Sequence, residues 1–482
     1  MKIVIVGGGT AGWIAAYSLS IAQPNMHDIT VIESSKIGII GAGEGSTGIL
    51  HDLLTGRLFG DAGLDIADFM QKTDSTDKFG IVHQFWDKDN NQYFAPIDGS
   101  ISHSLDNDFI FKYVLQKFGH DQFHLSSKLG MDYELGIPNT DSAFHFDGHK
   151  VGQFFKSHCV KNNVKVIDSV VQQVNLNDRG HVSSLLLEDG LVIDGEFFFD
   201  CTGFSRLVMN AVDSKWVSYK KYLPVDTAMP FIVKYKNNEN VLPVTTATAL
   251  SSGWMWNIPL LTRRGCGYVF DSNYISKEQA QQEIETHLNA KIEPIKFINF
   301  TSGRSDNFWK NNVLSLGLAS SFVEPLEATS IHSTIVQIHQ FITEFLTPDA
   351  VSTITEENSL LYNKNMLDLF ESIFNFISLH YQGGKENSEF WRDIKHNQIV
   401  TEYTRVLLER SKNKILGNAI FETHGLGTPG AALWNWVLAG MRIIGPEQAR
   451  KELLNSGLLE KAQSTYIEFF NQYKQNLEKS GV

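Results

Sequence analysis

Three glycines near the N-terminus, Gly7, Gly9 and Gly12, have the G-x-G-x-x-G spacing of a phosphate-binding turn. Glycine at these positions lets the backbone turn tightly and approach a pyrophosphate, and the following helix presents free N–H groups to the anion. Glu33 stands 21 residues after Gly12, where an acid can accept a hydrogen bond from a ribose hydroxyl. The spacing therefore predicts a dinucleotide site. A large insertion of strands is expected between the first part of the nucleotide-binding sheet and the rest of it. This layout favours FAD over NAD.

A second glycine-rich segment, GAGEGST (Gly41 to Thr47), combines small residues with one acid, Glu44, and two hydroxyl groups. Such a segment could line a cofactor, and it could equally be a surface loop. The segment FDCTGFSR (Phe199 to Arg206) is typical of a strand that ends in Thr-Gly. In flavoproteins of this architecture such an end returns the chain to the nucleotide, although alone it indicates only the end of a strand.

Two tryptophans stand two residues apart in the segment GWMWNIPL (Gly253 to Leu260). In an extended chain Trp254 and Trp256 point to one face and Met255 points to the other. Pro259 suits the end of a strand, where no ladder N–H is needed. Two rings on one face can belong to a packed core, or they can form a wall against a flat cofactor. This segment alone does not decide between the two.

The composition is that of an ordinary globular protein, with 482 residues, of which 42% are hydrophobic and 20% charged. A formal net charge of -13 without a run of lysine and arginine excludes an obvious nucleic-acid surface. The three cysteines are far apart and predict no disulfide framework. No stretch reaches the roughly 18 apolar residues of a membrane helix, and the first apolar run is too short for a signal peptide. We therefore expect a cytoplasmic protein without membrane or nucleic-acid partners.

Other chemistries find little support. His145 and His149 are four residues apart, but Gly148 argues against a helix there and no third ligand is evident, so we expect no metal. No G-x-S-x-G element indicates a hydrolase.

The order of apolar patterns predicts an α/β fold with a doubly wound β-α-β core. The runs KIVIV, TAGWIAAYSLSIA and DITVIE are expected as strand, helix and strand. From about residue 164 the pattern turns to strands, and after about Phe322 helices dominate. We expect residues 1–345 to form an FAD-binding module with an inserted β-sheet. Residues 346–482 are expected to form helices that pack back on this module and shape the substrate pocket.

Several stretches taken together resemble one family, the flavin-dependent halogenases of the tryptophan-halogenase type. The matching stretches are GGGTAGW, GAGEGST, Lys78 in DKFGIVHQFW, AFHFDGHKV, DCTGF, GWMWNIPL, GYVF, SGRSDNFWKNNVLSLGLASSFVEPLEATSI (Ser302 to Ile331) and LHY with FWRD (Leu379 to Asp393). They follow one another in the family's order over most of the chain. The W-x-W-x-I-P element and the run around Glu-Pro-Leu-Glu are specific to the family, whereas the other motifs are shared more widely. The resemblance implies a flavin monooxygenase-like fold.

The resemblance also implies a reaction. Reduced FAD (FADH2), delivered by a separate NAD(P)H-dependent flavin reductase, O2 and a halide ion together give hypohalous acid. This oxidant passes through the protein to a chamber that holds a small electron-rich aromatic molecule. Lys78 matches the family lysine, which hydrogen-bonds the oxidant or carries the halogen as a haloamine. Glu327 matches the family glutamate, which polarises the electrophile or takes the ring proton.

The resemblance implies further site residues. In the family the W-x-W-x-I-P strand lies beside the flavin and blocks a substrate from the ring, so the expected flavin wall is Trp254, Trp256 and Pro259. The residues expected to bind the cofactor are Gly7, Gly9, Thr10, Ala11, Gly12, Trp13, Glu33, Gly43, Glu44, Ser46 and Gly317.

The halide is expected at the start of a helix in EPLEATSI. The backbone N–H groups of Thr329 and Ser330 would be free there and would suit an anion. The carboxylate of Glu327 falls just before this helix and could cap it, and Glu324 is expected to be a surface carboxylate. Tryptophan chlorinases commonly have Glu-Ser-Thr-Gly where this chain has Ala328 and Ser330 around Thr329. The change predicts bromide, with iodide as a further candidate, in preference to chloride.

The expected substrate walls are Phe85, Trp86, Phe94, His103 and Trp434, with Tyr93 and Trp436 as further candidates. The Trp-x-Trp spacing in LWNWV does not place both rings on one helix face, so core packing is the expected role of one of them. No set of groups that would hold an amino acid's ammonium and carboxylate is evident. An indole or a phenol is therefore at least as good a candidate as free tryptophan.

Two other function classes stay open at this point. A flavin-dependent aromatic monooxygenase of the same fold would not need Lys78 and Glu327, and a non-catalytic FAD-binding protein would not speed the oxidation of reduced flavin. Fold analogy alone does not choose among these classes. The chain could also form a homodimer.

Overall fold

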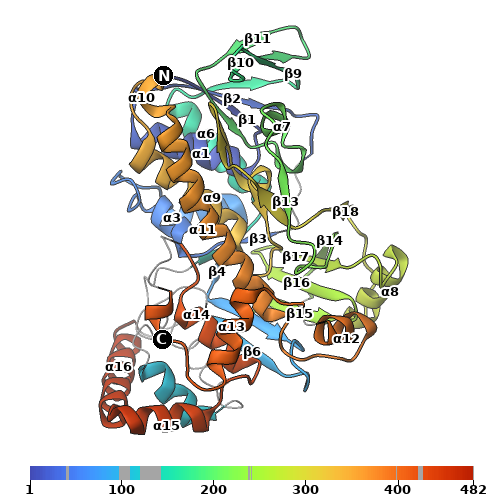
Figure 1. Ribbon diagram of the computed structural model, residues 1–482, viewed down its shortest axis with the longest axis vertical. Helices are drawn as coiled ribbons and strands as arrows, with labels where there is room; N and C mark the ends of the chain where they lie inside the picture. Colours follow the sequence, from blue (N-terminus) through green and yellow to red (C-terminus); the bar gives the residue numbers. More distant parts are fainter. Residues whose placement is uncertain are drawn as a thin grey trace.

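The computed structural model describes residues 1–38, 43–96, 109–119, 143–236, 239, 241–397, 399–421 and 427–480. Figure 1 shows the sheet that carries the N-terminus at one end of the molecule and the last helices, α14 to α16, at the other.

The first strand, helix and strand form where the sequence predicts them. Strand β1 is Lys2–Val6, helix α1 is Thr10–Ala22 and strand β2 is Asp28–Glu33. Strand β1 lies inside a six-stranded sheet of order β20-β21-β12-β1-β2-β8. All of its strands are parallel except the edge strand β20. The other four are β8 (Lys165–Asp168), β12 (Phe197–Asp200), β20 (Trp309–Lys310) and β21 (Val313–Ser315).

Both faces of this sheet are covered, which explains the unbroken apolar character of β1. Ile3 and Ile5 face the main core beneath α1 and α6 (Gly148–Lys161), whereas Val4 and Val6 face a smaller cluster on the other side. That cluster includes side chains of an antiparallel three-stranded sheet and of a short helix. These elements are β9 (Val171–Leu176), β10 (Val182–Leu187), β11 (Val192–Asp194) and α7 (Leu207–Ala211).

A second, seven-stranded sheet is the expected insertion. Its order is β18-β14-β17-β16-β15-β5-β6, and its strands pair antiparallel except for β15 and β5. The two tryptophans lie on its central strand β16 (Gly253–Pro259), which ends at the proline as expected. The other strands are β5 (Gly80–Gln84), β6 (Gln92–Pro96), β14 (Thr227–Lys234), β15 (Thr245–Leu250), β17 (Arg263–Phe270) and β18 (Ile298–Asn299).

Two small antiparallel sheets connect these layers. One has the order β3-β7-β4, and its register pairs Gly45 and Thr76 with His145 on opposite sides. It thereby brings Lys78, at the end of β4, beside the second glycine loop. The strands of both small sheets are β3 (Glu44–Gly45), β4 (Thr76–Lys78), β7 (Ala143–Phe146), β13 (Trp216–Ser218), β19 (Gly303–Ser305) and β22 (Ser321–Phe322).

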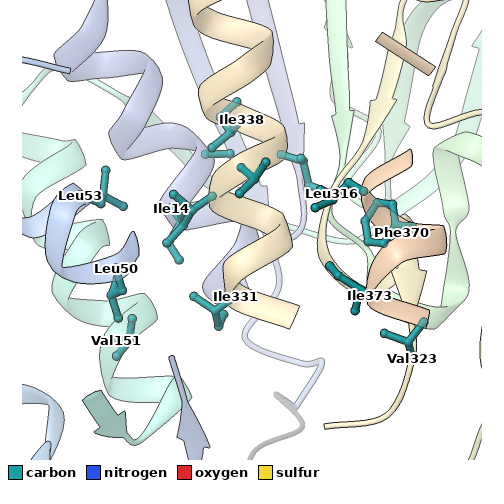
Figure 2. Close-up of a cluster of buried hydrophobic side chains, with 14 of the residues drawn as sticks. Ile14, Leu50, Leu53, Val151, Leu316, Val323, Ile331, Ile338, Phe370 and Ile373 are labelled. Atoms are coloured by element: carbon teal, nitrogen blue, oxygen red, sulfur yellow. The ribbon is translucent and has the colours of Figure 1, made fainter. Parts of the chain in front are cut away.

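Helices α9 (Thr329–Gln340) and α11 (Glu356–His380) contact each other and run side by side from the parallel sheet towards the second sheet (Figure 1). Figure 2 shows how one apolar cluster joins them to α1, with Ile14, Ile331 and Ile338 near Phe370 and Ile373. Full burial of each such side chain stabilises the fold by about 1.5–3 kcal/mol. The contact fixes the start of α9 and the end of α11, and both carry site residues.

The last helices pack round a separate apolar cluster that includes Trp434, Phe376 and Leu416. The part of the chain after about Phe322 is mainly helical as expected, and the boundary at residues 345 and 346 stays a prediction. The remaining α-helices are α2 (Gly48–Leu54), α3 (Ile66–Thr73), α8 (Lys277–Leu288), α10 (Ala350–Thr353), α12 (Glu389–His396), α13 (Glu402–Ser411), α14 (Ala431–Gly440), α15 (Pro446–Ser456) and α16 (Leu459–Ser480). Short 3-10 or π helices span Gly203–Ser205, Gly317–Ala319, Phe341–Phe345 and Asn418–Ile420, and residues 109–119 are helical. Among the helices that the structure describes, none is long and apolar enough to cross a membrane.

Candidate functional site

The first glycine turn has the geometry of a phosphate cradle. Gly7 has a φ of +116°, and a Cβ atom there would overlap the carbonyl of Cys201. A Cβ atom at Gly12 would overlap the carbonyl of Gly7, because α1 starts so close to β1. At Gly9, by contrast, a Cβ atom would have nothing within 4 Å. The turn is thus closed on its inner side and open at the start of α1, which fits the phosphates of a dinucleotide.

The residues predicted around this turn have different surroundings. Glu33 ends β2 and forms an ion pair with Lys156 of α6, directly beneath Gly8. It lies at the carboxyl edge of the sheet, where a ribose would be placed. Trp13 is fully buried, with Lys156 over its ring, and Thr10 donates a hydrogen bond to the carbonyl of Gly148 at 3.0 Å. The side chains of Trp13 and Thr10 therefore anchor α1 to α6.

The second glycine loop lies against the same edge. Gly43 has a φ of +112°, and a Cβ atom there would stand 3.1 Å from the Cα atom of Gly265. Glu44 lies against Gly148 at the start of α6, and burial together with nearby Asp147 raises the pKa of Glu44 to about 7. A Cβ atom at Gly317 would stand 2.8 Å from the Cβ atom of Ala11. The structure therefore brings the predicted cofactor residues together, although their roles stay predictions.

Lys78 is a buried lysine at the meeting point of two loops. Its side chain is 1% exposed, and its Nζ donates a hydrogen bond to the carbonyl of Ser46 at 3.1 Å. A Cβ atom at Gly45 would lie 3.0 Å from this Nζ and 3.5 Å from the Cβ atom of Ala328. The amine thus lies against the second glycine loop, and Ala328, which precedes α9, lies near the same residue of that loop. A solvated surface charge, the ordinary role of a lysine, does not apply here.

Glu327 does not cap α9, which corrects the expectation from sequence. The N-cap residue is Ala328, whose φ of 55° lies in the left-handed region, and no side chain caps the helix. The carboxylate of Glu327 instead turns towards two buried histidines. Its Oε1 atom lies 2.8 Å from Nε2 of His380 and 3.3 Å from Nε2 of His83. Burial acts to raise the pKa of Glu327, but the two histidines outweigh it and bring the pKa down to about 2.

Sequence reasoning missed both histidines of this cluster, which we call the histidine–glutamate cluster. His83 lies in the same motif as Lys78, and His380 lies in the LHY motif, so each was quoted without a role. Both side chains are 0% exposed. Burial lowers the pKa of His83, against the opposing effect of Glu327. The available signal was that each of two matched motifs contains a histidine.

The histidine–glutamate cluster has the composition of a metal site, with three ligand atoms within 4.8 Å of one another. In a tetrahedral site with bonds near 2.05 Å, neighbouring ligand atoms stand about 3.3 Å apart. The separation of 2.8 Å between His380 Nε2 and Glu327 Oε1 is shorter than that, yet neither atom meets the geometry of a hydrogen bond in the described structure. The three residues therefore form a buried, closely spaced group whose facing atoms have no hydrogen-bond partner, and the expectation of no metal stays a prediction.

The first turn of α9 carries the residues predicted for the halide. Thr329 is 8% exposed, and Thr329 and Ser330 are the first two residues of the helix. Backbone N–H groups in a first turn have no partner within the helix. Ala328, which directly precedes them, lies close to Gly45 of the second glycine loop, where a Cβ atom would stand 3.5 Å from the Cβ atom of Ala328. The placement is compatible with an anion, and the role stays a prediction.

The two tryptophans of β16 share a face, as predicted. Trp254 and Trp256 belong to the main core, with ring centroids 6.3 Å apart, whereas Met255 packs into a separate cluster on the other face. The ring of Trp256 covers Gly267 of the neighbouring strand, where any Cβ atom would overlap it. Both rings are buried in the described structure, so core packing is shown and the role as a flavin wall stays a prediction.

Glu324 is not a surface carboxylate, and that expectation was wrong. The side chain is 2% exposed. Its Oε2 atom accepts a hydrogen bond from Trp254 Nε1 at 2.9 Å and another from the Tyr381 hydroxyl at 2.7 Å. Burial raises the pKa of Glu324 to about 7, although these two bonds act to lower it. The acid therefore fixes the tryptophan ring to the end of α11.

We expect Glu324 to make stability fall as the pH rises. Its pKa is about 7 in the folded protein against an ordinary value of 4.5, so the folded state binds the proton more tightly. This contribution, on the order of 3 kcal/mol, is present below about pH 4.5 and is lost as the pH approaches 7. Glu324→Gln keeps an acceptor oxygen without the charge. Thermal unfolding measured from about pH 5 to pH 8 is expected to show the wild-type Tm falling relative to this variant.

Glu188→Gln is a matched control, because Glu188 pairs with Lys36 at the surface. The Tm of this control is expected to follow the wild type at every pH. Parallel Tm curves for wild type and Glu324→Gln would contradict the prediction.

The predicted substrate residues do not form one group. Trp86 lies in the site, with its ring 6.1 Å from His380 and 6.2 Å from Trp254. Phe94 of β6 packs in a small separate cluster with Phe79 and Val244, and not with Trp86 and Trp254. Phe85 has a φ of 64° at the end of β5, and His103 lies outside the described residues.

Trp434 and Trp436 both belong to the apolar cluster of the last helices. Core packing, which was expected of one of the pair, is therefore seen for both. Tyr93 stacks on His83 with ring centroids 4.7 Å apart, so of the two further candidates Tyr93 is the one in contact with the histidine–glutamate cluster.

Comparisons with known proteins agree with this arrangement. The family model described as tryptophan halogenase matches residues 2–454. The 7-chloro-L-tryptophan 6-halogenase KtzR of Kutzneria sp. is 30% identical over 429 residues, which cover 82% of this chain and 81% of that protein. The crystal structure of the tryptophan 6-halogenase SttH from Streptomyces toxytricini superposes with a TM-score of 0.85 at 25% identity, covering 99% and 97% of the two chains. Xcc4156, a flavin-dependent halogenase from Xanthomonas campestris, superposes with a TM-score of 0.79 at 26% identity and covers 98% of each chain.

Proposed function

This chain belongs to the tryptophan halogenase family and is a flavin-dependent halogenase that needs a separate flavin reductase, and from that premise we propose its reaction. The enzyme uses reduced FAD, O2 and bromide to halogenate an electron-rich aromatic molecule such as an indole or a phenol. Iodide is a further candidate halide, and chloride is disfavoured.

The single observation that carries the proposal is the burial of a lysine and a glutamate in one part of the interior. Lys78 and Glu327 are 1% and 8% exposed; Lys78 lies against Gly45 of the second glycine loop, and Glu327 directly precedes Ala328, which approaches the same glycine at the start of α9. Buried charges are costly unless function or pairing retains them. A fold that only bound FAD would gain nothing from a lysine in this place.

Separate groups of residues hold the flavin, hold the halide and keep the substrate from the flavin. A bound reduced flavin supplies the electrons with which O2 converts halide into hypohalous acid. The first glycine turn holds the dinucleotide phosphates, and Glu33 accepts a hydrogen bond from a ribose hydroxyl. The N–H groups of Thr329 and Ser330 hold the halide at the start of α9. Trp254 and Trp256 keep the aromatic substrate away from the flavin ring.

Two side chains act on the substrate. The Nζ atom of Lys78 holds the oxidant, by a hydrogen bond or as an N–halogen bond, next to the ring carbon that is to be halogenated. Glu327, which is a carboxylate throughout the neutral range, accepts the proton that this carbon loses. Both roles need groups that water does not reach, as their burial provides.

The halide preference rests on the first turn of α9. Ala328 removes a hydroxyl that relatives of the chlorinating type have beside the glutamate, and Ser330 replaces a glycine. The left-handed φ of Ala328 keeps the turn in place, but a side chain now stands at Ser330. Bromide and iodide are less strongly hydrated than chloride and are easier to oxidise. We therefore expect a halide site with less exact geometry to serve bromide and iodide better than chloride.

One assay tests the reaction and the halide together. The purified protein is mixed with FAD, NADH, a flavin reductase, O2, catalase and a panel of indoles and phenols, with bromide, chloride or iodide in turn. We expect a mass-spectrometric bromine doublet, with bromide turned over faster than chloride. Chloride rates equal to or above bromide rates would overturn the halide proposal. A hydroxylated product would indicate the monooxygenase instead.

A further inference from the structure

Trp254 lies between two groups of the proposed site. The centroid of its ring is 6.3 Å from that of Trp256, the other tryptophan of β16, and 6.2 Å from that of Trp86. The ring of Trp86 in turn lies 6.1 Å from that of His380 in the histidine–glutamate cluster. One indole ring thus connects the expected flavin wall with the cluster that contains Glu327.

The tryptophans of this part of the core are held by two kinds of hydrogen-bond acceptor. Nε1 of Trp86 donates a hydrogen bond to a main-chain carbonyl of β15 at 2.9 Å, and Nε1 of Trp391 donates to another carbonyl of β15 at 2.7 Å. Nε1 of Trp254 instead donates to the side chain of Glu324 at 2.9 Å. Of these three rings, Trp254 is therefore the one whose orientation depends on the side chain of another residue.

Glu324 is a costly residue for the packing of a core. Its side chain is 2% exposed, and its Oε1 atom is buried without a hydrogen-bond partner in the described structure. Its backbone φ of 67° lies in the left-handed region, which residues other than glycine rarely adopt. A buried carboxyl group and a strained backbone both destabilise the folded state, and such features are retained where function needs them. A neutral side chain would serve packing alone at a lower cost.

Glu324 is itself fixed by the residue that follows α11. Its Oε2 atom accepts a hydrogen bond from the Tyr381 hydroxyl at 2.7 Å in addition to the bond from Trp254. Tyr381 is buried, and its ring centroid lies 5.7 Å from that of Trp86 and 5.7 Å from that of Trp391. One oxygen atom thus joins the ring of Trp254 to a tyrosine that is packed on two sides.

We propose that Glu324 is a positioning residue of the halogenase, whose Oε2 atom holds the Trp254 ring in the wall between the flavin and the aromatic substrate. The inference rests on the proposed role of Trp254 in that wall. Without the acceptor oxygen, the indole N–H of Trp254 has no partner in the core, which favours another orientation of the ring. A ring that leaves its position opens the wall, so reduced flavin is oxidised without halogenation of the substrate.

The first test is the ratio of halogenated product to reduced flavin oxidised, measured with bromide near pH 7 for Glu324→Leu and Glu324→Gln. Leucine has no acceptor oxygen, whereas the amide oxygen of glutamine can accept both hydrogen bonds. We expect the ratio to fall about 10-fold in Glu324→Leu and to stay within about 2-fold of the wild-type ratio in Glu324→Gln. A general loss of folded enzyme would lower both reactions together and leave the ratio unchanged.

Glu283→Leu is the matched control, because Glu283 of α8 has a similar role on the other face of the same sheet. Its Oε2 atom accepts hydrogen bonds from the hydroxyls of Ser251 at 2.8 Å and Tyr268 at 3.0 Å. Tyr268 packs with Met255, away from the face that carries the two tryptophans of β16. We expect this control to have a lower Tm and the wild-type ratio.

Three results of this first test would overturn the inference. The first is a wild-type ratio in Glu324→Leu. The second is a ratio in Glu324→Gln as low as that in Glu324→Leu, because the acceptor oxygen would then not be the cause. The third is an equal fall in Glu283→Leu, which would indicate a merely structural effect.

A second measurement needs neither flavin nor turnover. Nitrogen NMR of protein labelled at tryptophan reports how fast each indole hydrogen exchanges with water, and the Trp254 signal is identified by its absence in Trp254→Leu. We expect slow exchange in the wild type and in Glu324→Gln, and exchange about 10-fold faster in Glu324→Leu. An unchanged exchange rate in Glu324→Leu would refute the inference.

Tyr381→Phe takes the place of Glu324→Leu if that variant does not fold. It removes the hydroxyl that fixes Glu324 and leaves the packing of the ring. We expect faster exchange of the Trp254 indole hydrogen and a product ratio about 2- to 5-fold below that of the wild type. Wild-type values of both quantities in Tyr381→Phe would contradict the inference.

The failure of the inference differs from the failure of the proposed function. If the wild type halogenates no substrate with any halide, the proposed function is wrong, and the exchange of the indole hydrogen still tests the bond to Glu324. If Trp254→Leu keeps the wild-type ratio, the role of Trp254 in the wall is wrong. If Trp254→Leu lowers the ratio but Glu324→Leu does not, only the role of Glu324 is wrong.

Discussion

Replacing Lys78 with methionine is expected to abolish halogenation while reduced flavin is still oxidised at the wild-type rate. Methionine keeps the length and the apolar stem of the side chain but has no amine to hold the oxidant. Lys78 is 1% exposed, so its replacement changes the interior and not the surface. The loss of a group that binds the reacting atom directly is expected to reduce the rate about 1,000-fold or more. Product formation is measured by mass spectrometry, and flavin oxidation by absorbance.

The hydrogen bond from Lys78 to Ser46 raises the question of whether the variant still folds. Retained FAD binding and an unchanged melting curve would show that it does. Lys72→Met is a suitable control, because Lys72 pairs with Asp68 on an exposed face of α3. We expect wild-type halogenation from this control. Selective halogenation by Lys78→Met at near the wild-type rate would refute the role of the lysine.

The parts of the fold that sequence predicts are those in which neighbouring residues decide the structure. The apolar run of β1, the glycine turn and helix α1 follow from local spacing, and the structure has all three. The alternation of Trp254 and Met255 is equally local, because opposite faces are a property of any strand. The resemblance to known halogenases supplied what spacing could not, namely the choice of Lys78 and Glu327 as candidate catalytic residues.

The errors arose where distant segments decide the environment of a residue. Glu324 was expected at the surface because a lone glutamate usually is, but its partners Trp254 and Tyr381 are 70 and 57 residues away in the chain. Glu327 was a candidate cap for α9 because of its position, but the N-cap residue is Ala328, in the left-handed region, and no side chain caps the helix. The neighbouring residues in the sequence indicate neither the burial of Glu324 nor the orientation of Glu327. Glu324 is buried by Trp254 and Tyr381, and Glu327 lies beside His83 and His380, all of which come from distant parts of the chain.

Burial explains the scattered substrate predictions in the same way. Several aromatic residues that lie near the matched motifs in sequence were candidates for the substrate wall. The face of the strand on which each one lies decides whether it reaches the site. Tyr93 and Phe94 are adjacent on β6, yet Tyr93 stacks on His83 and Phe94 packs in a different cluster. The end of α11 brings His380 to the site from nearly 300 residues beyond His83. The sequence alone gives no sign that two residues so far apart in the chain lie together in the fold.

The second large effect is expected from Glu327→Gln. Glutamine keeps the shape of the side chain but cannot take the proton of the halogenated ring carbon. Halogenation is expected to slow by about 100- to 1,000-fold, which is the usual contribution of a general base. Flavin oxidation does not involve this proton and is expected to continue at the wild-type rate. The halogenated product is measured by mass spectrometry at several substrate concentrations, which separates kcat from KM.

Deuterium on the substrate makes this prediction specific to proton removal. When the base is present, loss of the ring proton is fast and replacing it with deuterium is expected to change the rate little. When the base is absent, breaking the C–H bond becomes slow, so Glu327→Gln is expected to show a clear isotope effect. Glu452→Gln, which breaks an ion pair with Lys112 away from the site, is expected to show none. A large loss in Glu327→Gln without an isotope effect would assign Glu327 to polarising the oxidant beside Lys78. The same loss with the isotope effect would assign it to the ring proton, because only that step contains the bond to hydrogen.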